Sequence, residues 1–436
     1  MVDVAEVKIW GELVGAVRWD SERQLASFQF DKKFLSKNWD LSPIKMPVSK
    51  GDIIYSFPEL RVRHNEENTF KGLPGLLSDA LPDKYGNQLI NLWLAQNGRP
   101  ANSMNPVEQL CFTGSRGMGA LEFEPAQFTA SKLAFDIELS SLIDAAQKML
   151  SKREGFETNL KENERKALSE ILKVGTSAGG ARPKAVIAYN KNTSEVKSGQ
   201  TNAPKGFEHW LLKLDGVSDA QFGESSGYGR VEYAYYLMAI DSGVEMMECK
   251  LLEENNRAHF MTKRFDREGG DTKHHIQTFC GIHHYDYNNM QSFSYEQLFQ
   301  TMRLLKLTYP EAEQMFRRMV LNVMASNNDD HTKNFSFRMK KDSKWELSPA
   351  YDVCYSYDPS SVWVSQHALS INGKRKGFVR EDLLTIAKSN NIKKADKIIE
   401  EIKTVVCNWK KYAKKVNVNE KLTSSITENL ECFKID

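Results

Sequence analysis

Three polar side chains around residue 330 have the spacing of a phosphoryl-transfer site. Four residues separate Asp329 from Asn334, and Asp352 follows Asn334 by eighteen positions. In protein kinases, an aspartate in the first position accepts the proton of the substrate hydroxyl, and the other two side chains hold magnesium against the ATP phosphates. Phosphoryl transfer needs little covalent help, but it needs an oriented hydroxyl and neutralised phosphate charge. The spacing alone is a weak signal, so its weight depends on the elements upstream.

The upstream elements follow the order of a kinase nucleotide-binding lobe. A loop of small residues at 175–184 (GTSAGGARPK) ends a helical pattern, and a buried strand is predicted at 185–189. A strand at 210–214 carries Lys213, a helix at 231–242 carries Glu232, and another strand is predicted at 259–265. Small residues let backbone amides approach phosphates, and a buried lysine is costly without an anion. The open alternatives are a flexible turn for the loop and, for the lysine, a side chain that reaches solvent from a sheet edge.

The remaining sequence predicts two flanking regions. Alternating runs at 7–10, 15–19 and 25–30 indicate a small antiparallel sheet, and a turn-helix-turn at 70–83 and a helix at 85–96 follow it. The glycine cluster at 114–119 (GSRGMG) lacks the lysine of a phosphate-binding P-loop, so we interpret it as a plain turn. A polar helical linker is expected at 136–172. The last region is mainly helical: a helix with Pro310 at its first position leads into the 329–334 loop, and further helices are predicted at 381–389, at 394–412 and from 420.

Composition limits the class of protein. The chain has 436 residues, 27% of them charged, and a formal net charge of +2, so the chain as a whole is not a strongly basic nucleic-acid binder. The six cysteines are scattered without a C-x-x-C pair, which predicts reduced thiols. The sequence shows no secretion signal and no apolar run long enough to span a membrane, so we expect a cytoplasmic protein. Four histidines and a cysteine resemble a metal cluster, but their spacing fits no recognised zinc site: His274, His275, Cys280, His283 and His284.

Several of these segments together resemble the HipA family, the bacterial serine/threonine kinase toxins of HipBA toxin–antitoxin modules. FKGLPGLLSDALPD and GMGALEFEP are similar to the family's N-terminal domain. SAGGARPKA, HWLLKLD, KRFDR, NDDHTKNFSF and SPAYD occur in the order of its kinase core. The resemblance implies an α+β, HipA-like kinase fold related to phosphoinositide and protein kinases. It divides the chain into an N-terminal β-rich domain (1–125), a kinase N-lobe (126–266) and a helical C-lobe (267–436).

The resemblance also implies roles for particular residues. Asp329 would be the catalytic aspartate and Lys213 the lysine that binds the ATP phosphates, while Asn334 and Asp352 would bind Mg²⁺. Ser177 falls on the position of an autophosphorylated serine, whose phosphate would repel ATP and switch the kinase off. The chain departs from the family pattern at Asp330, where glycine is expected, and we keep Asp329 as the base because of its spacing to Asn334. Further ATP contacts are expected at Gly179, Gly180, Ala181, Lys184, Phe265 and His331.

The leading hypothesis is therefore an ATP- and Mg²⁺-dependent serine/threonine protein kinase. By resemblance, its partners would be a HipB-like helix-turn-helix antitoxin and, through that complex, operator DNA. Its protein substrate would be translation-related, for which glutamyl-tRNA synthetase, an aminoacyl-tRNA synthetase, is the family's example. Two alternatives stay open: a catalytically silent DNA corepressor that acts with a helix-turn-helix partner, and a kinase for a small molecule or lipid.

Overall fold

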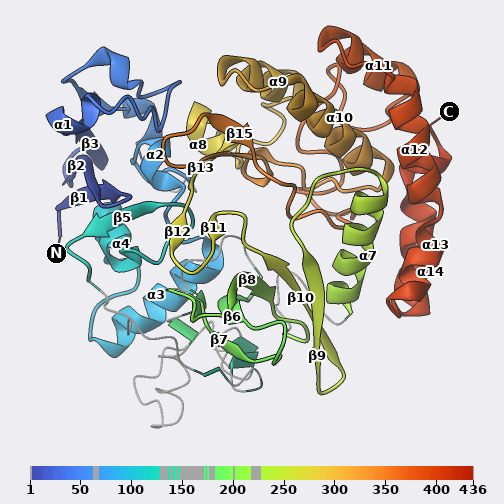
Figure 1. Cartoon of the computed structure of the whole chain (residues 1–436), viewed down its shortest axis with the longest axis horizontal. Coiled ribbons are helices and arrows are strands. Elements are labelled where there is room, and N and C mark those ends of the chain that lie inside the picture. Colours follow the sequence, from blue (N-terminus) through green and yellow to red (C-terminus); the bar gives the residue numbers. More distant parts are fainter. Residues whose placement is uncertain are drawn as a thin grey trace. The chain divides into compact units, whose positions relative to one another are not determined.

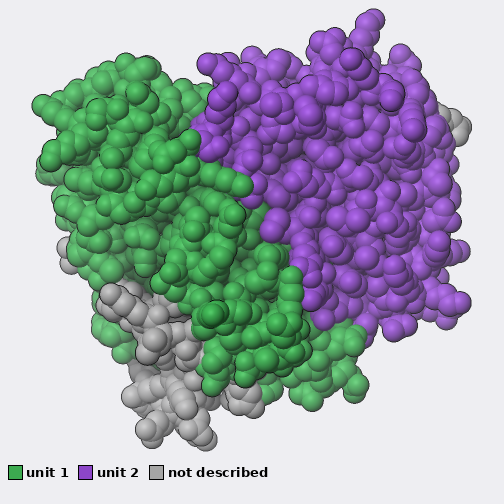
Figure 2. All heavy atoms as spheres, in the orientation of Figure 1, with its two compact units in different colours: residues 1–226, 252–276, 340–342 green, residues 227–251, 277–339, 343–436 purple. Residues whose placement is uncertain are grey.

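The computed structural model describes residues 2–61, 68–127, 136–137, 140, 142–143, 146–147, 171–172, 174–175, 182–199, 202–217 and 227–435. The chain forms two compact units, coloured separately in Figure 2. The first unit comprises residues 1–226, 252–276 and 340–342, and the second comprises residues 227–251, 277–339 and 343–436. The linker predicted at 136–172 lies largely outside the described residues. The three-region division stays a prediction.

An antiparallel sheet begins the first unit (Figure 1). Its strands are β1 (Val4–Ile9), β2 (Glu12–Asp20), β3 (Leu25–Phe30), β4 (Ile54–Ser56) and β5 (Leu121–Glu124), in the order β4-β3-β2-β1-β5. The strands predicted at 7–10, 15–19 and 25–30 are confirmed as β1 to β3, because alternate side chains are buried along them. Short helices connect the strands: α1 (Lys32–Leu35), η1 (Val48–Lys50), η2 (Pro58–Leu60), α2 (Gly75–Ser78), α3 (Lys84–Gln96) and α4 (Pro106–Thr113).

A second sheet carries the residues of the predicted nucleotide-binding lobe. Its order is β7-β6-β8-β10-β9, formed by β6 (Lys184–Tyr189), β7 (Val196–Ser198), β8 (Glu208–Lys213), β9 (Cys249–Glu254) and β10 (Arg257–Lys263). The predicted strands at 185–189 and 210–214 are confirmed as β6 and β8. The strand predicted at 259–265 ends earlier, at Lys263, so Phe265 lies in the turn before β11 (Arg267–Glu268) and β12 (Thr272–Lys273).

The core of the first unit packs α3 against this second sheet. Tyr85, Leu89 and Leu94 of α3 join Ile187, Trp210 and Leu212 in one cluster of side chains that are almost completely buried. Burying a large apolar side chain of this kind contributes about 1.5–3 kcal/mol. Gly175, where the small-residue loop begins, lies against the same helix: a Cβ there would come within 2.8 Å of Leu89 Cδ1. The glycine therefore allows the chain to pass close to α3 before it enters the loop.

The second unit is mainly helical (Figure 1). Its helices are α7 (Tyr228–Asp241), α8 (Phe279–His283), α9 (Tyr295–Leu304), α10 (Tyr309–Met324), α11 (Arg380–Ser389), α12 (Ala395–Cys407), α13 (Trp409–Lys415) and α14 (Glu420–Asn429), with short η3 (Thr332–Asn334) and η4 (Glu431–Phe433). A small sheet, β13-β14-β15, contains β13 (His275–Thr278), β14 (Ser336–Met339) and β15 (Trp345–Leu347). Helix α12 packs on α10, and α13 packs on α7.

Two helix predictions in this unit need correction. The helix predicted at 394–412 is two helices, because the chain turns at Asn408 between α12 and α13. Pro310 occupies the second helical position rather than the first, since α10 begins at Tyr309. Thr308 precedes the helix, and both its backbone N–H and its hydroxyl donate to Glu311 Oε2, at 2.6 and 2.7 Å. Pro310 is tolerated one residue later because the amides of a helix's first turn have no acceptor within the helix.

The prediction that all cysteines are reduced is wrong for one pair. Cys407 at the end of α12 and Cys432 in η4 form a disulfide, with their Cα atoms 5.8 Å apart. The other four cysteines form no disulfide with any described residue. Sequence spacing gave no signal for the pair, because the two positions are 25 apart and the helices α13 and α14 lie between them. Among the helices of the described residues, none combines the length and apolar character needed to cross a lipid bilayer.

A buried histidine predicts a pH-dependent stability. His275 is 1% exposed, its Nε2 lies 3.0 Å from the carbonyl oxygen of Leu41, and burial lowers its pKa to about 4. Between the two pKa values, the ring is neutral in the folded protein and protonated in the unfolded chain. The stability that the neutral ring contributes is therefore complete above the unfolded pKa and is lost as the pH falls through the folded pKa. We expect the free energy of unfolding to fall by about 2 kcal/mol between pH 7 and pH 5 through this group alone. Urea unfolding at both pH values checks this, and His275→Gln should remove that part of the decrease; an unchanged pH dependence in the variant would contradict the assignment.

Candidate active site

Helix α10 leads directly into the loop that carries the predicted catalytic residues. An apolar stripe at helical spacing is buried on this helix: Phe316, Met319, Val320, Val323 and Met324 are each 0% exposed. After Ala325 the chain turns at Ser326, which has a φ of +51°. Three hydrogen bonds then join Asn328 to the segment 356–368. Its N–H donates to Ser356 O and its side-chain amide donates to Val364 O. Its carbonyl oxygen accepts from Ala368 N–H. Asp329 is therefore the first residue beyond a firmly held stretch of backbone.

Asp329 presents its carboxylate to solvent, and its backbone is held by its predicted partner. The Asp329 side chain is 46% exposed. Asn334 Nδ2 donates to the carbonyl oxygen of Asp329 at 2.6 Å, which closes the loop across its five-residue separation. His331 caps the start of η3: its Nδ1 accepts from Lys333 N–H at 3.3 Å, while its Nε2 lies 3.7 Å from Asp329 Oδ1. The structure thus brings together three predicted residues, with one accessible carboxylate.

The neighbouring Asp330 has a different environment. Its side chain is 0% exposed. It accepts four hydrogen bonds, from Tyr295 Oη at 2.8 Å, His367 Nδ1 at 2.9 Å, and the backbone N–H groups of Ala368 and Leu369 at 2.7 and 3.3 Å. This carboxylate also lines the pocket described below, but its acceptor positions are filled by these contacts, so it anchors the loop. Of the two adjacent aspartates, only Asp329 is therefore placed to act on a substrate.

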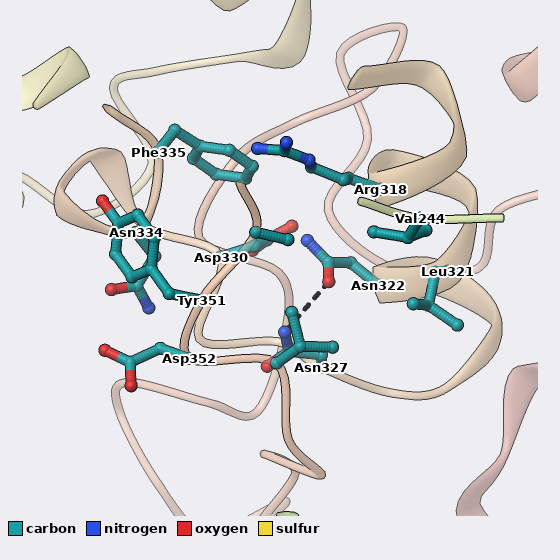
Figure 3. A pocket seen from close by; sticks show the side chains of 12 residues that line it. Val244, Arg318, Leu321, Asn322, Asn327, Asp330, Asn334, Phe335, Tyr351 and Asp352 are labelled. Atoms are coloured by element: carbon teal, nitrogen blue, oxygen red, sulfur yellow. Dashed lines mark hydrogen bonds between the residues drawn. The ribbon is translucent and has the colours of Figure 1, made fainter. Parts of the chain in front are cut away.

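Asp352 and Asn334 line the same small pocket of the second unit (Figure 3). In Figure 3 they lie on one side of the pocket, opposite Arg318 and Leu321. Asp352 has a φ of +51°, a left-handed conformation that non-glycine residues adopt rarely and that is enriched at functional positions. Because Asn334 Nδ2 is engaged by Asp329, its Oδ1 is the atom left to bind a cation.

These two residues fit the requirements of magnesium. The ion prefers oxygen ligands, and it is commonly held by one or two protein groups together with water and substrate phosphates. A carboxylate and an amide oxygen on one pocket wall meet that description. Within the described residues, no group of three or more His, Cys, Asp or Glu side chains is arranged to hold a metal by itself. Two of the histidines that resemble a metal cluster in the sequence contact protein groups instead: His274 Nε2 lies 3.1 Å from Glu268 Oε2, and the His283 ring stacks on Tyr285.

Three residues of the second-unit site could not be found from local sequence patterns. Tyr295 and His367 bind Asp330 from positions 35 and 37 residues away. Arg318 is 5% exposed and lines the pocket from α10, and burial lowers its pKa to about 10. Helical periodicity places Arg318 on the side of α10 opposite the stripe of Phe316, Met319 and Val320, where it predicts a solvent-exposed residue, so the burial of Arg318 could not be predicted. Its position on the pocket wall is visible only in the folded chain.

In the first unit, two predicted ATP ligands face each other. Lys184 of β6 and Lys213 of β8 are directly paired in the antiparallel ladder, so their side chains point to the same face of the sheet. Lys213 Nζ also lies 5.7 Å from the centre of the Phe260 ring on β10. Lys184 is 4% exposed. A polyphosphate bound on this face would accept charge-assisted hydrogen bonds from both ammonium groups.

The other predicted nucleotide ligands are placed only in part. Phe265 lies in the turn after β10 and is half-buried. Gly179, Gly180, Ala181 and Ser177 lie outside the described residues. Glu232, which the helix predicted at 231–242 carries, is 8% exposed on α7 and is therefore buried. The predicted roles of all these residues stay predictions.

Comparison with known proteins assigns the family. The chain matches the model of the HipA-like C-terminal domain over residues 176–409 and that of the HipA N-terminal domain over residues 5–124. The chain therefore belongs to the HipA family, as its motifs predicted. No curated protein sequence matches it.

Solved structures confirm the predicted fold. The chain is similar to HipA from the toxin–antitoxin system of Shewanella oneidensis MR-1, in a complex with HipB and its operator DNA. The TM-score is 0.61 at 16% sequence identity, and the alignment covers 97% of this chain and 94% of that one. A proinflammatory kinase of Helicobacter pylori, CtkA, aligns at a TM-score of 0.34 and 14% identity over 57% of this chain and 94% of its own. The second likeness is too low to carry an argument.

Proposed function

We propose that this protein is an ATP- and Mg²⁺-dependent serine/threonine protein kinase of the HipA type. One observation carries the proposal: the 329–334 loop exposes a single carboxylate, on Asp329, while Asn334 fixes its backbone and lines one pocket with Asp352. Asp329 would orient the substrate hydroxyl and accept its proton. Asn334 and Asp352 would bind Mg²⁺, which would neutralise charge on the transferred phosphate.

The first unit would supply the nucleotide contacts. Lys213 and Lys184 would bind ATP phosphates from one face of the sheet, since both side chains emerge there. The backbone of Phe265 would contact the adenine, and the loop at Gly179, Gly180 and Ala181 would cover the phosphates. His331 would contact the nucleotide from the edge of the 329–334 loop. Phosphorylation of Ser177 would place a dianion in that loop, where it would repel ATP and switch the kinase off.

Family membership supports a proposal for the partners and the substrate. The similar Shewanella protein is recorded with HipB and operator DNA, which supports a helix-turn-helix antitoxin and operator DNA as partners of this chain. A net charge of +2 gives this chain no strong attraction to DNA of its own, so that contact would depend on the antitoxin. The substrate would be a translation-related protein in the cytoplasm, such as an aminoacyl-tRNA synthetase.

Incubation with radiolabelled ATP tests the proposal. Purified wild-type protein with Mg²⁺ and a bacterial lysate is expected to transfer label to a lysate protein and to itself, and Ser177→Ala should remove the self-labelling. If the label appears only in a small molecule, the substrate of the kinase is a metabolite and not a protein. If no product carries label, the kinase proposal fails, and the catalytically silent corepressor becomes the better account.

Lys213 gives a prediction for binding alone. Lys213→Met should raise the dissociation constant for Mg·ATP by about tenfold to a hundredfold, because it removes a charge-assisted contact to phosphate. Isothermal titration calorimetry measures this directly. Lys205→Met is the matched control, since Lys205 is an exposed lysine of the same unit, and it should bind as the wild type does. Equal affinity in both variants would remove Lys213 from the phosphate site.

A further inference from the structure

Two motifs whose charged and glycine residues have no role in the proposed chemistry meet inside the first unit. One is the charged segment around Phe265 (KRFDR, 263–267), and the other is the glycine cluster at 114–119. Asp266 Oδ2 accepts the backbone N–H of Gly119 at 2.8 Å. Arg267 Nη1 and Nη2 donate to the carbonyl oxygens of Gly119 and Gly117, at 2.9 and 3.0 Å. The turn of the N-terminal domain is thus hydrogen-bonded to the segment predicted to contact adenine.

The charges in this contact are buried and paired. Arg264, Asp266 and Arg267 are 3%, 0% and 8% exposed. Arg264 donates twice to Asp266, from Nε at 2.8 Å and Nη2 at 2.6 Å, and Arg267 Nη1 donates to the same carboxylate at 2.6 Å. Fork-shaped guanidinium contacts of this kind fix geometry as well as energy. One carboxylate therefore holds two arginines and one glycine amide in a single arrangement.

Main-chain hydrogen bonds also hold the backbone on both sides of Phe265. Arg264 N–H donates to His209 O on β8 at 2.9 Å, and Asp266 O accepts from His274 N–H at 3.0 Å. Phe265 itself lies between two residues whose side chains are buried and locked, while its own side chain is only half-buried. A turn fixed at both ends but open in the middle suits a segment that offers backbone groups to a ligand.

The receiving turn requires glycine. Gly119 has a φ of +78°, which residues with a Cβ adopt at a cost. This conformation presents the Gly119 N–H to Asp266 and the Gly119 carbonyl to Arg267 within one residue. The backbone groups of this glycine cluster, which resembles a phosphate loop in sequence, are thus bound by Asp266 and Arg267 of the protein itself.

We infer that Asp266 is a positioning residue for adenine recognition: through its bonds to Arg264, Arg267 and Gly119, it sets the backbone at Phe265, so that the N-terminal domain controls nucleotide affinity. The inference rests on the proposed function, because it assumes that ATP binds at this segment. The inference predicts that a change at Asp266 weakens binding of the adenosine part of the nucleotide. Binding of the phosphates, which Lys184 and Lys213 would contact, should not change.

Calorimetry with two separate probes tests this inference. Adenosine reports on the Phe265 segment, and Mg²⁺ tripolyphosphate reports on the phosphate contacts. Asp266→Asn should raise the dissociation constant for adenosine by about tenfold and leave that for tripolyphosphate unchanged, whereas Asp266→Glu should recover part of the adenosine affinity. Asp271→Asn is the matched control, an exposed aspartate in the turn that follows, and both probes should bind to it as to the wild type.

A second variant keeps the test decisive if Asp266→Asn does not fold. Gly119→Ala leaves all three charges in place and disturbs only the receiving turn, and it should also weaken adenosine binding selectively. Thermal melts establish that each variant is folded at the temperature of titration. Wild-type affinity for adenosine in folded Asp266→Asn or Gly119→Ala, or equal loss of both probes, would overturn the positioning role. A wild type that binds neither probe would instead overturn the proposed function, and this inference with it.

Discussion

Replacing Asp329 by asparagine is expected to lower kcat for phosphate transfer by about 10²- to 10⁴-fold, while Mg·ATP binds with unchanged affinity. The asparagine keeps the size of the side chain but cannot accept the substrate proton. The loop geometry should survive, because Asn334 is bonded to the backbone carbonyl of Asp329 and not to its carboxylate. The measurement combines initial rates of phosphate transfer with calorimetric titration of Mg·ATP into each protein.

The control for this variant is a neutralised aspartate outside the loop. Asp396 on α12 is 71% exposed and pairs with Arg380, so Asp396→Asn should retain wild-type kcat. A large loss of ATP affinity in Asp329→Asn would show that the residue binds nucleotide instead of acting on the hydroxyl. Activity close to the wild-type value would exclude Asp329 as the base.

Replacing Asp330 by asparagine is expected to act on stability instead. We predict a decrease of about 2–4 kcal/mol in the free energy of unfolding. An asparagine amide has one oxygen, so its NH₂ group would face either the donors from Tyr295 and His367 or the backbone amides of Ala368 and Leu369. Either orientation leaves buried donors without an acceptor, which removes their stabilising contribution.

Chemical denaturation at neutral pH, with Asp329→Asn as the matched control, measures this effect. The two positions are adjacent and carry the same substitution, but the Asp329 side chain is 46% exposed and the Asp330 side chain is 0% exposed. Asp329→Asn should therefore unfold at the wild-type denaturant concentration. Equal stability of Asp330→Asn and wild type would show that the four hydrogen bonds contribute little.

Local patterns predicted the elements whose burial repeats along the sequence. The strands β1, β3, β6 and β8, the helix α3 and the buried face of α10 follow from alternation or helical spacing. Asp329 and Asn334 could also be predicted as candidate site residues, because they lie within one short segment of the sequence. Helix boundaries were less predictable: Asn408 ends α12 without a proline or glycine to mark the break.

The contacts that distinguish the two aspartates could not be predicted, because they join distant segments. Nothing next to Asp330 in sequence indicates that Tyr295 and His367 close over it. The same holds for Gly119 and Asp266, which are 147 residues apart. In both places the sequence shows a short motif, but it does not show that the aspartate in the contact is buried by a distant segment.

The central claim is that Asp329 directs phosphate from ATP to a protein hydroxyl. Mass-spectrometric mapping of phosphorylated residues after incubation of the protein with Mg·ATP and lysate tests it most directly. The account predicts new phosphoserine or phosphothreonine in a lysate protein with the wild type and none with Asp329→Asn. The same phosphorylated sites with both proteins, or no phosphorylated protein with either, would contradict it.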